Sequence, residues 1–131
     1  MQTLETMRTI QESIPPHNAE TGHDRAVIVL TTWPADAGGD EVARALVERR
    51  LAACVTRLPL HRVVYRWKDA IEDGDESQWL IKTTADRLEG LWEAVRTAHP
   101  YDTPEWLVVP VEAGSADYLA WVRASTAPAA P

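Results

Sequence analysis

The chain has 131 residues, a formal charge of −7 and a pI of about 5.0. Its length is that of one ordinary domain, and its acidic balance excludes the broad basic surface that binds phosphate backbones, so nucleic acid is not an expected partner. Cys54 is the only cysteine. An intrachain disulfide is therefore excluded, and the reducing cytoplasm is the expected location.

The first 24 residues contain neither the apolar core of a signal peptide nor a stretch able to span a bilayer. We expect residues 1–24 to form a mobile extension, and we expect no membrane partner. The folded domain is expected over residues 25–125. Residues 126–131, rich in Ala and Pro, are expected to be a flexible tail.

Apolar periodicity predicts the first elements of the domain. Residues 25–33 form a β-branched apolar run that predicts a buried strand. Residues 40–50 place apolar side chains on one helical face, with Asp40 as the N-cap. β-Branched residues return over 52–67. Asp73-Gly74 predicts the turn of a hairpin that pairs residues 61–67 with 78–84.

The second half predicts a helix over residues 85–99, a strand over 105–111 and a closing helix over 114–125. The order βαββαβ is typical of an α+β, ferredoxin-like sandwich with a long hairpin, here followed by an extra C-terminal helix. Two helices cover only one face of such a sheet. The other face would then carry apolar side chains and favour self-association. The candidates for that face are Val63, Trp67, Trp79 and Ile81.

Four segments, in order, resemble the CutA divalent-cation tolerance family: ERRLAACVTRLP, YRWKDAIEDGDESQWLIKTT, HPYDTPEWLVVPV and DYLAWVRAS. The resemblance implies a ferredoxin-like subunit assembled into a homotrimer, with an architecture similar to the PII signalling proteins. It also implies binding of divalent or transition metal ions, copper foremost, with a role in metal tolerance and homeostasis. Some relatives carry further cysteines proposed as copper ligands, whereas this chain has only Cys54.

Three side chains are candidate metal ligands. Cys54 would supply a thiolate, His99 an imidazole nitrogen and Glu105 a carboxylate oxygen to copper or another divalent metal ion, and no organic cofactor is expected. Each of these three side chains could instead have a purely structural role. Cys54 could be a small core residue, His99 could cap its helix, and Glu105 could form an ion pair with Lys82.

A cleft between subunits is expected to be shaped by Lys82, Tyr65, Trp67 and Tyr101, although aromatic side chains on a sheet also serve as packing. This cleft supports an alternative function. A PII-like signalling or interaction module would bind a small anionic effector near Lys82 and contact a protein partner through its hairpin tips. The sequence has no phosphate-binding loop and no hydrolase or metalloprotease motif, so no enzymatic activity is expected.

Overall fold

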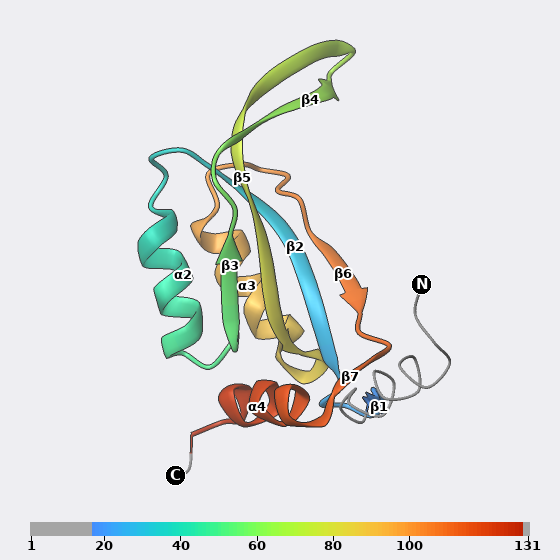
Figure 1. The fold of residues 1–131 in the computed structure, drawn as a ribbon. Helices are drawn as coiled ribbons and strands as arrows, with labels where there is room; N and C mark the ends of the chain where they lie inside the picture. Colours follow the sequence, from blue (N-terminus) through green and yellow to red (C-terminus); the bar gives the residue numbers. More distant parts are fainter. Residues whose placement is uncertain (1–16, 130–131) are drawn as a thin grey trace, which may run out of the picture.

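The computed structural model describes residues 17–129. Its main sheet contains β2 (Ala26–Pro34), β3 (Cys54–Arg57), β4 (His61–Trp67), β5 (Ala70–Thr84) and β6 (Leu107–Pro110). The strands run in the order β3-β5-β2-β6, all neighbours are antiparallel, and β4 pairs with β5 (Figure 1). With a helix after β2 and another before β6, this is the predicted βαββαβ order of a ferredoxin-like subunit.

The core lies between the sheet and the helices α2 (Gly39–Glu48) and α3 (Leu88–Ala98). Side chains alternate across a strand, so every second residue of β2 and β5 points toward these helices. Eight residues of this core are at most 2% exposed: Val29, Trp33, Leu46, Ala52, Trp79, Ile81, Leu91 and Val95. The prediction that Trp79 and Ile81 occupy the uncovered face is therefore wrong. In the described part of the chain, no helix is long and apolar enough to cross a membrane.

β4 and the first half of β5 form a hairpin that projects beyond the sheet (Figure 1). Its turn is Lys68-Asp69, with φ angles of 49° and 65°, as in the two-residue turns that match strand twist. The predicted turn at Asp73-Gly74 is wrong, because Gly74 lies within β5 opposite Val63. A turn at residues 68–69 gives all seven residues of β4 a partner.

The N-cap of α2 lies two residues earlier than predicted. Gly38 is its N-cap, with a left-handed φ of 73° that suits glycine. Asp40 lies in the first turn instead, where a carboxylate interacts favourably with the helix dipole, and it forms an ion pair with Arg57. The prediction of Asp40 as N-cap is therefore wrong.

The predicted N-terminal extension is divided. Residues 1–16 lie outside the described residues, whereas β1 (His17–Ala19) pairs with β7 (Ala113–Ser115). The carboxylate of Glu20, 3% exposed, accepts a hydrogen bond of 2.8 Å from Arg123. Because the backbone pairing and this sheltered ion pair both anchor the segment, residues 17–20 pack on the domain.

The C-terminal helix α4 (Ala116–Thr126) closes the end of the sheet where β2 begins. Its Leu119 and Val122 form a second apolar cluster with Ala26 and Ala53. Thr126, the first residue of the predicted tail, is buried and hydrogen-bonded to Thr84. The packed part therefore reaches residue 126, and residues 130–131 lie outside the described residues.

The two turn assignments can be separated by paired substitutions. Asp69→Gly is expected to raise the free energy of unfolding by about 1 kcal/mol, because it removes the cost of a left-handed non-glycine residue. Gly74→Ala is expected to leave stability unchanged or raise it slightly, since no atom lies within 4 Å of a Cβ at this position. Denaturant unfolding measures both. A clear loss of stability in Gly74→Ala would instead place the turn at residues 73–74.

Candidate functional site

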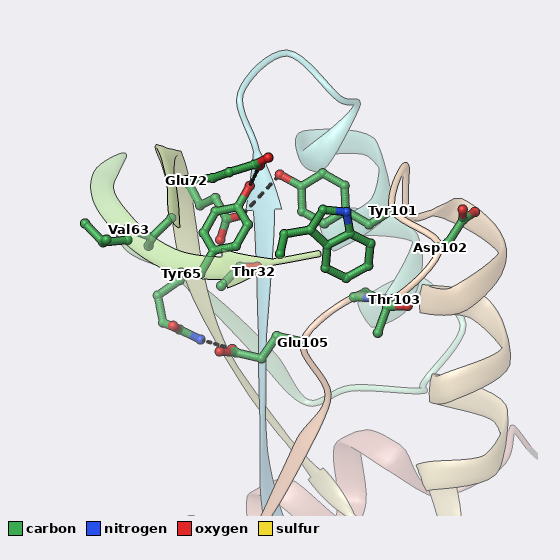
Figure 2. Close-up of a pocket in the computed structure, with 13 residues that line it drawn as sticks. Thr32, Val63, Tyr65, Glu72, Tyr101, Asp102, Thr103 and Glu105 are labelled. Carbon is green, nitrogen blue, oxygen red and sulfur yellow. Dashed lines mark hydrogen bonds between the residues drawn. The ribbon is translucent and has the colours of Figure 1, made fainter. Parts of the chain in front are cut away.

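A cleft of about 680 Å³ opens where the base of the hairpin meets the corner between α3 and β6 (Figure 2). The hairpin supplies one wall, with Tyr65, Trp67 and Glu72, and the corner supplies the other, with Tyr101 and Asp102. The remaining lining residues are Thr32, Val63, Val64, Glu76, Gln78, Thr103, Pro104 and Glu105. The cleft is therefore both aromatic and acidic.

Two tyrosines each donate a hydrogen bond to a carboxylate of the cleft. Tyr65 lies opposite Glu72 in the β4–β5 ladder, and its hydroxyl is 3.3 Å from Oε2 of Glu72. Tyr101 Oη is 3.1 Å from Oε1 of Glu76. Partial desolvation and then the carboxylate partner raise the pKa of each tyrosine above its usual value of 10.0. Both hydroxyls therefore remain protonated donors at neutral pH.

Glu105 is held at the inner end of the cleft by neutral groups. Gln78 Nε2 donates to Oε2 of Glu105 at 2.7 Å and to the carbonyl of Thr31 at 2.9 Å. The hydroxyl of Thr31 donates to the backbone carbonyl of Glu105 at 2.6 Å. The carboxylate is thus oriented by an amide, and no ion pair of Glu105 is formed among the described residues.

Lys82 and Cys54 lie together outside the cleft. They are opposite each other in the β3–β5 ladder, Lys82 donates to the hydroxyl of Thr56, and Cys54 Sγ is 3.8 Å from that same oxygen. Lys82 is four residues from Gln78 on β5, about 13 Å along the strand. This separation explains why the considered ion pair between Lys82 and Glu105 does not form.

His99 fixes the corner to the sheet. The residue is 8% exposed, and its Nε2 lies 2.7 Å from the carbonyl of Thr32 while Nδ1 accepts the backbone N–H of Tyr101 at 3.0 Å. A neutral ring protonated on Nε2 satisfies both contacts. Since metal ligation requires an unprotonated nitrogen without another partner, this arrangement leaves His99 no nitrogen for a metal.

The three predicted metal ligands do not converge within one chain. Cys54 lies beside Lys82, Glu105 lies at the inner end of the cleft, and both nitrogens of His99 are hydrogen-bonded. Among residues 17–129, no group of three His, Cys, Asp or Glu side chains could hold a metal ion. The described residues of one subunit therefore do not provide a metal centre.

Of the four predicted cleft residues, the structure places Tyr65, Trp67 and Tyr101 around one cavity and leaves Lys82 outside it. Sequence reasoning missed the acidic residues Glu72, Glu76 and Asp102, which line the same cavity. The position of the hairpin turn in the sequence could have identified Glu72. A turn at residues 68–69 would have placed it directly opposite Tyr65, whereas the predicted turn left it in a solvated hairpin tip.

A family model described as CutA1 divalent ion tolerance protein matches residues 27–125. The chain is 47% identical over 100 residues to the divalent-cation tolerance protein CutA of Pectobacterium atrosepticum, covering 76% of this chain and 91% of that protein. It is 38% identical over 106 residues to CutA of Escherichia coli, covering 81% and 95%. Both matches extend over nearly the whole relative.

Solved structures agree with this match. The divalent cation tolerance protein Cut A1 of Thermus thermophilus superposes with a TM-score of 0.75 at 38% identity, covering 78% of this chain and 99% of that one. CutA of Synechococcus elongatus gives 0.76 at 34% identity, covering 86% and 96%. The similarity therefore includes the fold as well as the sequence.

We expect His99→Ala to lower the free energy of unfolding by about 2 kcal/mol, because it leaves the buried carbonyl of Thr32 without its donor. The exposed His61 is the matched control, and His61→Ala should change stability by about 0.5 kcal/mol or less. Denaturant unfolding at one chain concentration measures both. Equal stability of the two variants would contradict a structural role for His99.

Proposed function

This chain belongs to the CutA1 divalent ion tolerance family, and on that premise we propose that it is a non-enzymatic, cytoplasmic homotrimer that binds divalent or transition metal ions, copper foremost. Its role would be in metal tolerance and homeostasis. Its relatives are named divalent-cation tolerance proteins, which supports a role in tolerance to divalent cations. The main observation in favour of a trimer is the exposed apolar edge of the sheet at β6. The proposed shared metal site depends on that trimer.

The edge strand β6 supports self-association. All four of its residues are exposed and apolar, with 53% of Leu107 and 41% each of Val108 and Val109 accessible. An edge strand also presents backbone groups with no neighbour on one side, and natural monomers protect such edges with charges or short, twisted strands. β6 is short and ends at Pro110, but it carries no charged side chain, and its exposed apolar residues are better explained by a second copy of the chain that covers them.

The hairpin supports the same conclusion. Val64 is 71% exposed and Ile71 63% exposed, on strands that extend past the sheet. A two-stranded hairpin with exposed apolar side chains is marginally stable by itself in water. Contacts from neighbouring subunits would bury these residues and support the projecting strands. The family resemblance implies three subunits.

The proposed metal site would be shared between subunits, because residues 17–129 of one chain do not bring three ligands together. Cys54 is half-buried and its thiol is a candidate donor for soft metals such as Cu(I). Glu105 has one carboxylate oxygen, Oε1, outside the hydrogen bonds of the described residues. We propose that these donors are completed by groups of a neighbouring subunit, and that His99 is not among them.

The alternative of a small anionic effector is less well supported. The expected cation, Lys82, lies outside the cleft and bonds Thr56. The cleft itself is lined by four carboxylic acids, and none of the described residues that line it is Lys, Arg or His. An anion would meet like charge on every side, which opposes its binding.

The trimer predicts a solution mass of three times the 14.6 kDa chain mass. We expect Val109→Glu to dissociate it, because the substitution buries a charge at an apolar contact. Val47→Glu, on an exposed position of α2, is the matched control and should leave the mass unchanged. Light scattering after size exclusion measures both. A wild-type protein with the mass of one chain would contradict the proposal.

Metal binding is tested by calorimetric titration of metal-stripped protein with Cu(I), Cu(II) and Zn(II). We expect saturation at an integer number of ions per subunit or per trimer, with affinity at least about tenfold lower in Cys54→Ser, because the thiolate is the softest donor. Glu105→Gln should also weaken binding, whereas His99→Gln should not. The control is Glu89→Gln, at an exposed position of α3.

Weak, non-saturating heats that are unaffected by Cys54→Ser would contradict a dedicated site. They would show that metal ions associate only with the acidic surface.

A further inference from the structure

The charge of the cleft is opposite to the charge that a site for a small anionic effector would need. Four carboxylic acids line it: Glu72, Glu76, Asp102 and Glu105. No positively charged side chain is among its described lining residues. Because like charges held in one concave site repel each other, a cationic occupant would be stabilised there.

Three of these carboxylates are oriented by neutral donors rather than neutralised by cations. Glu72 accepts from Tyr65, Glu76 from Tyr101 and Glu105 from Gln78, each through one oxygen. The second oxygen of each has no hydrogen bond from the described residues. A charged donor entering the cleft would therefore find oriented acceptors that no cation of the described residues pairs with.

These carboxylates do not form a metal site. No group of three metal-ligating side chains among residues 17–129 lies close enough to hold one ion. The acidic groups are instead distributed around a cavity of about 680 Å³, which lies in the size range of small-molecule sites. A cation that fits must be larger than a metal ion.

The walls of the cleft favour an occupant with an apolar part. Tyr65 and Trp67 stand on the hairpin wall and Tyr101 on the corner, all three lining the cleft, and Figure 2 shows Tyr65 and Tyr101 at the same opening. Aromatic rings attract cations through their faces and also pack against hydrocarbon. Lys68 Nζ lies 5.9 Å from the centroid of the Trp67 ring, so Trp67 already has one cation neighbour within the chain, and its contribution to the cleft is chiefly a surface for hydrocarbon.

We propose that the cleft binds a small organic cation: an aliphatic amine in its protonated form. Its ammonium groups lie against Glu72 and Glu76, and its hydrocarbon part packs on Tyr65, Trp67 and Tyr101. Glu105, a proposed metal ligand, also lines this cleft, but the ammonium contacts are made by Glu72 and Glu76, which are not proposed metal ligands, and the site requires no metal. Failure of the metal proposal therefore leaves it unaffected, and its own failure leaves the metal proposal unaffected.

The test is a calorimetric titration of the intact, metal-stripped protein with 1,6-diaminohexane at neutral pH. We expect saturable binding that weakens at least about tenfold in Glu76→Gln and in Glu72→Gln, since each loses a charge-assisted hydrogen bond. Trp67→Leu should also weaken binding. Glu89→Gln is the matched control for one lost surface charge and should bind as the wild type does.

Two further ligands separate recognition of an amine from general attraction. Hexane-1,6-diol has the same hydrocarbon chain without charge and should not bind, and Mg²⁺ at equal ionic strength should not displace the diamine. The proposal is overturned if the diamine gives no saturable heat, if Glu76→Gln and Glu72→Gln bind as tightly as Glu89→Gln, or if the diol binds equally well. Size exclusion of each variant verifies that its assembly is unchanged.

Discussion

The pairing of β2 with β5 is the constraint on which the rest of the structure depends. It extends over nine consecutive residue pairs, from Ala26 opposite Thr84 to Pro34 opposite Glu76. Because strand side chains alternate, this one register places Val29 and Trp33 with Trp79 and Ile81 toward the helices. A shift by one residue would turn these core side chains to the uncovered face.

The same register builds the cleft from residues that are distant in the sequence. Thr32 lies opposite Gln78, and Gln78 reaches Glu105. The carbonyl of Thr32 is bound by His99, whose other ring nitrogen fixes the backbone of Tyr101. The stiff corner after α3 therefore depends on the central strand, and the positions of its aromatic and acidic side chains follow from that attachment.

The element order and the class of fold could be predicted from the sequence, because period-two and period-3.6 patterns are local signals. The hairpin turn could not be placed from local chemistry. Asp73-Gly74 is the stronger turn signal, but pairing all of β4 with β5 requires the turn at Lys68-Asp69. Strand pairing outweighed turn propensity at this point, and Glu72 was missed as a consequence. The predicted ion pair between Lys82 and Glu105 is absent for a related reason. The distance between these two residues is set by the register of the strands, which local sequence patterns do not reveal.

The β4–β5 hairpin forms one wall of the cleft and is also the segment that we expect neighbouring subunits to contact. Tyr65 and Glu72 stand on its strands, whereas Tyr101 and Glu105 stand on the corner, so the width of the cleft depends on how the hairpin is held relative to the sheet. Within one chain, the hydrogen bond from Tyr101 to Glu76 spans this opening. A hairpin with exposed apolar side chains needs further support. Any contact that buries its exposed apolar residues would therefore also fix the hairpin wall of the cleft, so that the shape of the site is a property of the assembled protein.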